Sequence, residues 1–180
     1  MPNSETAKTD VLLRNQPGKL SDKVLFIIDD DETILEVICS HLEIQGFQSA
    51  NLHKFPASAE ALEIIRFVRP DLIISDIHMP GISGDTLAKL IQWPEFKNSP
   101  VIAITGDNDF KLDSSTGTFL DEVVYKPING VDLMSKVQKI LTIAERRQRA
   151  AQQDGKERTQ QQNRSIQNKE NGLRAAFGKD

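Results

Sequence analysis

Between residues 23 and 149, short apolar runs alternate with stretches that carry apolar residues at helical spacing. The short runs suit buried strands, and the amphipathic stretches suit surface helices. Such alternation is typical of βα units around a parallel sheet, so it predicts an α/β fold. We expect strands at residues 23–28, 47–52, 71–75, 100–104 and 119–125. We expect helices at residues 33–45, 56–68, 85–93 and 129–149.

The segment after residue 105, "GDNDFKLDSSTG", occupies the place where a helix is expected between two strands. Its residues are poor helix formers. A helix there is therefore expected to be short, mobile or absent.

Outside this pattern, we divide the chain into a flexible leader at 1–21, one domain at 22–146 and a polar tail at 147–180. The tail is rich in charge and glutamine but has no sustained apolar heptads, so we expect it to be disordered or partly helical rather than a coiled coil. Residues 1–143 carry 13 Lys+Arg and 21 Asp+Glu, whereas residues 144–180 carry 9 and 5. The acidic domain predicts no direct nucleic-acid binding, since phosphate backbones attract clustered Lys and Arg.

Cys39 is the only cysteine, which excludes an intramolecular disulfide and fits a reducing compartment. The first residues contain no apolar signal segment, and no apolar run approaches the ~20 residues of a membrane span. We therefore expect a cytoplasmic protein without membrane insertion.

The stretch "FIIDDDET" places Asp29, Asp30 and Asp31 directly after the first expected strand. Adjacent carboxylates raise one another's pKa unless a cation or hydrogen bonds offset the repulsion. Capping of the following helix explains one aspartate, and hard oxygen ligands suit Mg²⁺ or a similar ion. On these residues alone, a helix cap and a metal site remain equally supported.

Other polar residues also follow expected strands: Asp76, Thr105 and Lys126. In a parallel α/β sheet, ligands bind outside the carboxyl ends of the strands. Each residue alone fits a cap, a backbone-bonded hydroxyl or a solvated charge, but together they predict one site at a common edge.

The segments "VLFIIDDD", "DLIISDIHMPGISG", "VIAITGD" and "VVYKPI" resemble, in order and spacing, the signature segments of the receiver domain of two-component response regulators. The resemblance covers about residues 23–144. It implies a doubly wound (βα)5 flavodoxin-like parallel sheet with strand order 2-1-3-4-5. It also implies phosphorelay signalling, with a sensor histidine kinase or phosphotransfer protein upstream and a downstream protein target.

The same resemblance implies roles for individual residues. Asp76 matches the phosphoacceptor, and Mg²⁺ (or Mn²⁺) is expected on Asp29, Asp30, Asp76 and the backbone carbonyl of His78. Thr105 and Lys126 match the hydroxyl and the amine that bind the phosphoryl group. Pro127 matches a cis Lys-Pro bond. Such a domain catalyses its own phosphorylation and dephosphorylation rather than turnover of a separate substrate.

One position departs from the receiver pattern. The switch aromatic of the family stands three residues before the lysine, where this chain has Val123. Tyr125 lies on the same face of the expected strand, because side chains alternate, and it is the candidate replacement. The possible switch therefore comprises Thr105, Tyr125 and Val123.

Two alternatives remain. "FIIDDDET" also fits the start of a haloacid-dehalogenase-like phosphatase, with Asp29 as nucleophile and Asp31 as acid/base. That reading leaves "SDIHMPGISG" unexplained, and it finds only Asp132 where an acidic pair is required. The other alternative is a protein-binding module that is never phosphorylated.

Overall fold

The computed structural model describes residues 19–82, 86, 87, 89, 99–110, 112 and 119–177. Its strands are β1 (Leu25–Ile28), β2 (Leu52–Phe55), β3 (Leu72–Asp76), β4 (Val101–Thr105) and β5 (Glu122–Tyr125). Its helices are α2 (Glu32–Ile44), α3 (Ser58–Ile65) and α5 (Gly130–Phe177), with short 3-10 turns at Leu20–Asp22 and Ser49–Asn51. The predicted alternation of strands and helices is therefore present.

The five strands form one parallel sheet in the order β2-β1-β3-β4-β5. This is the flavodoxin-like order that the receiver resemblance implies. In the register, Asp76 lies beside Ile104, and Thr105 lies beside Tyr125. The carboxyl ends of β3, β4 and β5 therefore come together at one edge.

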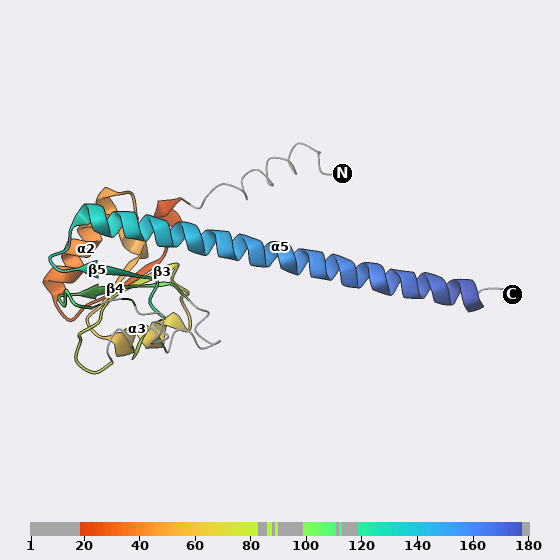
Figure 1. Ribbon diagram of the computed structural model, residues 1–180, viewed down its shortest axis with the longest axis horizontal. Coiled ribbons are helices and arrows are strands. Elements are labelled where there is room, and N and C mark those ends of the chain that lie inside the picture. The colour runs from red at the N-terminus through yellow and green to blue at the C-terminus, as the bar shows by residue number, and fades with distance from the viewer. Residues whose placement is uncertain are drawn as a thin grey trace. The chain divides into compact units, whose positions relative to one another are not determined.

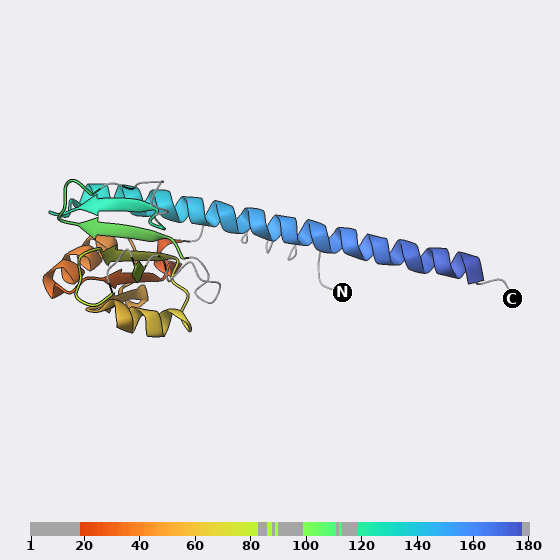
Figure 2. The same ribbon diagram turned by 60° about the horizontal axis from the view of Figure 1, so that its bottom comes forward.

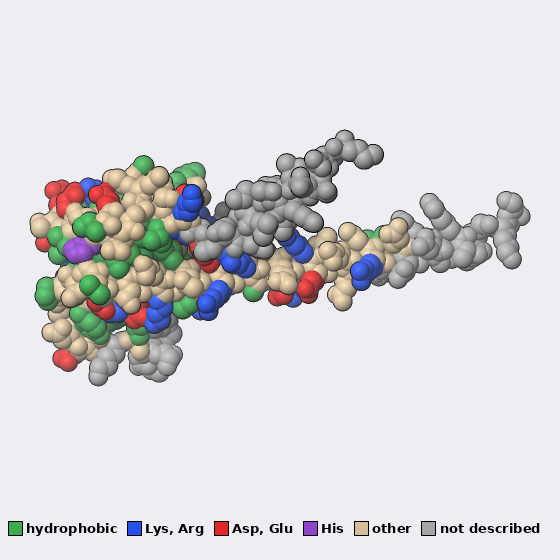
Figure 3. Space-filling view, turned by 90° about the horizontal axis from the view of Figure 1, so that it is seen from above, with side chains coloured by type: hydrophobic (Ala, Val, Ile, Leu, Met, Phe, Trp, Pro, Cys, Tyr) green, Lys and Arg blue, Asp and Glu red, His purple; other side chains and the backbone are tan. Residues whose placement is uncertain are grey.

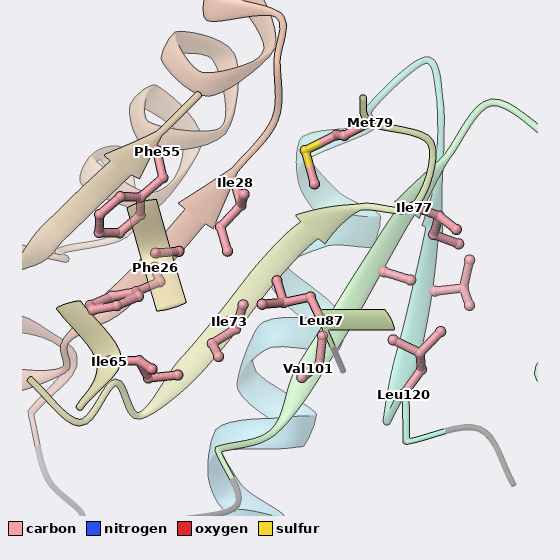
Figure 4. Packing of buried hydrophobic residues seen from close by; sticks show 13 residues of the cluster. Phe26, Ile28, Phe55, Ile65, Ile73, Ile77, Met79, Leu87, Val101 and Leu120 are labelled. Atoms are coloured by element: carbon pink, nitrogen blue, oxygen red, sulfur yellow. The ribbon is translucent and has the colours of Figure 1, made fainter. Parts of the chain in front are cut away.

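Helices cover both faces of the sheet, with α3 on one face and α2 with the first part of α5 on the other (Figures 1 and 2). The cluster beneath α3 contains Phe26, Ile73 and Val101 from the strands and Ile65 from the helix (Figure 4). Phe26 also packs on Phe55 with ring centroids 4.8 Å apart. Burial on both faces explains why β1, β3 and β4 read as continuous apolar runs.

The first turn of α5 packs closely on α2. A Cβ atom built on Gly130 would overlap the imidazole ring of His41. The ring is itself oriented by a 2.7 Å hydrogen bond between its Nδ1 and the carbonyl of Val37. Gly130 therefore permits a contact that a larger residue would prevent.

The second strand was predicted in the wrong place. Residues 49–51, expected at the centre of a strand, form a 3-10 turn, and β2 instead runs from Leu52 to Phe55. The Asn51 side chain donates to the Ser21 carbonyl at 2.8 Å, which fixes the turn. Because Asn51 and Ser21 are 30 residues apart, the residues around Asn51 do not indicate this contact.

Helix bounds also differ in detail from the expectations. α3 begins at Ser58, so Pro56 precedes the helix instead of opening it. The buried residues of α2 are Leu35, Ile38, Cys39 and Leu42. Of the helix expected at 85–93, residues 86, 87 and 89 are helical, and the others lie outside the described residues.

After β4, residues 106–110 and 112 form turns and irregular structure rather than a helix. The Phe110 amide donates to the Asp107 carbonyl at 3.2 Å, which closes one turn of this segment. The described residues of this segment are therefore not helical, in agreement with their poor helix-forming tendency.

The chain divides into two compact units, residues 1–142 and 143–180. α5 continues to Phe177, well beyond the expected helix end at 149, and its side chains from 146 to 164 are exposed. The division into leader, domain and tail at residues 22 and 147 stays a prediction. Within the described residues, every helix is too short or too polar to cross a membrane.

Candidate phosphoryl-acceptor site

The three aspartates after β1 do different things. The Asp29 carboxylate, fully buried, accepts a 2.9 Å hydrogen bond from the Asp31 amide. The Asp31 carboxylate accepts from the Thr33 amide at 2.8 Å and caps α2. This hydrogen bond lowers the pKa of Asp31, since it stabilises the ionised form. The helix-cap interpretation is therefore confirmed for Asp31, and the metal-site interpretation stays a prediction.

Asp76 ends β3 and is almost fully buried. Its Oδ1 accepts a 2.9 Å hydrogen bond from the His78 amide. That bond holds the carboxylate at the edge of the sheet and leaves Oδ2 to other partners.

Lys126 follows β5 and joins two of the acids. Its Nζ donates to Oδ2 of Asp76 at 2.7 Å and to Oδ2 of Asp29 at 3.0 Å. Its backbone amide donates to the Thr105 carbonyl at 2.7 Å, and the Lys126–Pro127 peptide bond is cis, as predicted. The lysine is thus anchored to β4 while its amine bridges β1 and β3.

Burial and pairing act against each other on Asp29 and on Lys126, and the pKa of both groups is raised. Burial raises the pKa of Asp29, and the Asp31 amide and Lys126 only partly offset the effect. Partial burial disfavours the charged amine of Lys126, but its hydrogen bonds to Asp76 and Asp29 outweigh this and raise its pKa. Lys126 is therefore protonated and positively charged at neutral pH.

Asp29, Asp30 and Asp76 bring one carboxylate oxygen each to within 4.8 Å of one another. Asp29 and Asp76 are buried and Asp30 is exposed, so this cluster opens to solvent on one side. Carboxylate oxygens are the ligands that Mg²⁺ and Mn²⁺ prefer. The donor set fits the predicted ion, and the His78 carbonyl as a further ligand stays a prediction.

Thr105 ends β4 with its side chain fully buried, and its Oγ1 accepts from the Asp107 amide at 3.0 Å. Tyr125, its neighbour on β5, is partly exposed and donates its hydroxyl to the Phe110 carbonyl at 2.7 Å. Both ends of the segment 106–110 are therefore held by side-chain hydroxyl groups. Val123 is buried in the cluster beneath α3.

Two contributions to the site were missed by sequence reasoning. The Asp29 carboxylate accepts hydrogen bonds from both the Asp31 amide and the Lys126 amine. The Thr105 hydroxyl accepts one from the Asp107 amide. The short spacing between Thr105 and Asp107, which suits a hydroxyl-to-amide turn, was the available signal for the second.

The geometry does not favour the phosphatase alternative. Its acid/base would be Asp31, whose carboxylate is engaged with Thr33. Asp76 belongs to the acidic cluster and lies in the segment "SDIHMPGISG", which the phosphatase alternative leaves unexplained.

A parallel five-stranded sheet with an acidic trio and a bridging lysine at the carboxyl ends of its strands defines a class of phosphoryl-accepting signalling domain. The family model described as "Response regulator receiver domain" matches residues 25–138, and the chain belongs to this family.

Individual relatives agree with this membership. The chain is 32% identical over 120 residues to the regulatory protein VanR of Enterococcus faecium, covering 66% of this chain and 49% of VanR. It spans about half the length of the transcriptional regulators AfsQ1 and YvrH as well. These proteins therefore contain further sequence that this similarity does not reach.

Solved structures show the same fold. The signal receiver domain of a histidine kinase from Syntrophus aciditrophicus has 29% sequence identity and a TM-score of 0.55, over 67% of this chain and 90% of that chain. The chemotaxis response regulator CheY4 of Vibrio cholerae, at 22% identity, has a TM-score of 0.58 over 66% of this chain and 98% of its own. The CheY4 similarity concerns the fold alone.

Proposed function

We propose that Asp76 accepts a phosphoryl group from a phosphohistidine of a sensor kinase or phosphotransfer protein, and that the modified domain alters its contacts with a downstream protein. The observation that carries the proposal is the Lys126 amine, 2.7 Å from Asp76 and 3.0 Å from Asp29, beside the acidic trio. Family membership supports the phosphorelay assignment.

In the transfer, an Asp76 carboxylate oxygen attacks phosphorus in line, the phosphorus–nitrogen bond of phosphohistidine breaks, and the imidazole departs. The obstacle is repulsion between the carboxylate and the phosphoryl oxygens, so catalysis requires neutralisation of charge. Lys126 contacts one phosphoryl oxygen, and the Thr105 hydroxyl, which accepts from the Asp107 amide and keeps its own hydrogen, donates to another. Mg²⁺ held by Asp29, Asp30 and Asp76 supplies further positive charge when bound.

The downstream partner is proposed to be a protein. The acidic composition of residues 1–143 is unfavourable for a phosphate backbone, and this supports the expectation of no direct nucleic-acid contact. A cytoplasmic location of this protein stays a prediction, as does a sensor histidine kinase or phosphotransfer protein as its upstream partner.

The test is phosphorylation by acetyl phosphate with Mg²⁺, followed by intact-mass measurement. We expect addition of one phosphoryl group to the wild type and none to Asp76→Asn, with Asp22→Asn as a remote control that stays labelled. Full labelling of Asp76→Asn overturns the assignment. Steady hydrolysis of p-nitrophenyl phosphate that Asp29→Asn abolishes supports the phosphatase, and a wild type that accepts no phosphoryl group supports the binding module.

A further inference from the structure

The ends of β4 and β5 are joined a second time through the segment 106–110. Thr105 and Tyr125 are partners in the pairing of these two strands. The Thr105 hydroxyl accepts from the Asp107 amide at 3.0 Å. The Tyr125 hydroxyl donates to the Phe110 carbonyl at 2.7 Å. The two hydroxyl groups therefore attach the segment at both of its ends and close a ring of contacts with the strand pair.

Two further hydrogen bonds lie inside this segment. The Phe110 amide donates to the Asp107 carbonyl at 3.2 Å, and the Asp109 amide donates to the Asp107 carboxylate at 2.9 Å. Both bonds fix the shape of the turn but not its position relative to the sheet. Residues 106–109 are exposed, and the partly buried Phe110 packs on the cluster beneath α3. The bond from Tyr125 fixes the carbonyl of this same Phe110, so it helps to determine where the Asp107 amide lies.

The Asp107 amide in turn selects the orientation of the Thr105 hydroxyl. The Thr105 backbone is held by the sheet, since its carbonyl accepts from the Lys126 amide at 2.7 Å. Its side chain has a few staggered rotamers, and each points the hydroxyl in a different direction. A hydrogen bond from Asp107 favours one of them and uses a lone pair only, so the hydroxyl keeps its hydrogen for donation.

Val123 cannot take the same part. It stands where the receiver family has its switch aromatic, but its side chain is aliphatic and only 5% exposed, within the cluster beneath α3. Tyr125 ends β5, is 37% exposed and is the only tyrosine of the chain. An aromatic side chain that turns inward at position 123 is therefore not available in this protein, whereas the hydroxyl at position 125 has a defined partner.

We infer that Tyr125 is a positioning residue for phosphoryl transfer. Its hydroxyl anchors the segment 106–110, and the anchored Asp107 amide holds the Thr105 hydroxyl in the orientation that donates to a phosphoryl oxygen. Tyr125 acts through Thr105 and not on the phosphoryl group itself. A donor that is already oriented does not have to be ordered when the phosphoryl group arrives, and this lowers the barrier. The inference rests on the proposed function, in which the Thr105 hydroxyl is such a donor.

The first test compares rates of phosphorylation by acetyl phosphate with Mg²⁺, followed by intact mass. Tyr125→Phe keeps the ring and removes only the hydroxyl. We expect it to slow phosphorylation about fivefold, the fold-change that corresponds to the loss of one ordinary hydrogen bond. A variant that is phosphorylated as fast as the wild type overturns the inference.

Thr142→Val is the matched control for this comparison. It removes a hydroxyl that donates to the Gln138 carbonyl at 2.8 Å. This bond lies on the surface of α5, where Figure 3 shows charged side chains of both signs. The control variant should be phosphorylated as fast as the wild type, because its hydroxyl belongs to the helix and not to the segment 106–110.

A double-mutant cycle separates positioning from a general loosening of the domain. In the Thr105→Ala background there is no hydroxyl to orient, so Tyr125→Phe should cause no further slowing. In the Thr105→Ser background the hydroxyl is present, and the slowing should return. The same slowing in the alanine background as in the wild type overturns the inference, since Tyr125 would then act independently of Thr105.

Amide exchange measured by NMR without Mg²⁺ gives a readout that does not depend on phosphoryl transfer. Tyr125→Phe should speed exchange of the Asp107 amide several-fold, because the segment has lost one anchor, and Thr142→Val should not. Unchanged exchange in Tyr125→Phe overturns the inference even when Asp76 is phosphorylated normally. A wild type that accepts no phosphoryl group overturns the proposed function, and this inference with it.

Discussion

The Nζ atom of Lys126 lies 2.7 Å from Oδ2 of Asp76, although 50 residues separate them in the sequence. The same amine lies 3.0 Å from the buried carboxylate of Asp29. One positive charge is thereby placed among three acids whose oxygens lie within 4.8 Å of one another. This arrangement leads to a prediction about metal affinity.

Replacement of Lys126 by glutamine should tighten Mg²⁺ binding by about tenfold, since a cation several ångströms from the metal position repels it. Phosphoryl acceptance should fall in the same variant. Calorimetric titration with Mg²⁺ measures the first effect. Lys139→Gln, which removes an exposed lysine paired with Glu122, is the control and should bind as the wild type does. Weaker binding by Lys126→Gln would contradict the electrostatic account.

Gly130→Ala should destabilise the domain by about 1–3 kcal/mol, because the added methyl group overlaps the His41 ring. Urea unfolding followed by circular dichroism measures the free energy of unfolding. The double variant His41→Ala/Gly130→Ala should recover part of the loss, since the methyl group then has room. If the double variant is as unstable as the sum of the single variants, the contact is not the cause.

Tyr125→Phe removes the hydroxyl that holds the Phe110 carbonyl. Residues 106–110 should already exchange amide hydrogens quickly in the wild type, because they form turns outside the sheet, and exchange should rise several-fold in the variant. Mass spectrometry of deuterated peptides measures this, with Phe119→Leu as the control at another exposed aromatic residue. Strong protection of this segment in the wild type would argue against its lack of helix.

Ser58→Ala should leave stability unchanged or raise it by about 1 kcal/mol. The Ser58 hydroxyl is buried and, among the described residues, has no hydrogen-bond partner. An unsatisfied buried polar group costs free energy that alanine avoids. Thermal and urea unfolding of the variant decide the point, and a clear loss of stability would reveal a partner for the hydroxyl.

Burial raises the pKa of the Cys39 thiol to about 11. At pH 8 its alkylation by iodoacetamide should be about 100-fold slower than in the urea-unfolded chain, because the reactive thiolate is scarce. As pH rises from 9 to about 11, the unfolded thiol loses its proton before the folded one, so this group's contribution to stability falls.

Cys39→Ala should therefore show a shallower loss of stability between pH 9 and about 11 than the wild type. Identical pH profiles for the two proteins would exclude Cys39 as a source of that loss.

Much of the fold and the site was predictable from the chain itself. Apolar runs and helical spacing are local patterns, so they indicated five strands, and polar residues at strand ends indicated where the site lies. The second strand was misplaced because Asn51 contacts Ser21, and that contact is not written in the neighbouring residues. The role of Asp29 was left open because its partner Lys126 is distant along the chain.

The sequence by itself determined which residues stand at or near the ends of β1, β3, β4 and β5, because hydrophobic periodicity depends only on neighbours along the chain. Only the tertiary structure decided that Asp29 lies against Lys126 and that Gly130 meets His41. These choices depend on packing between segments brought together by the sheet, where distance in space is unrelated to distance along the chain.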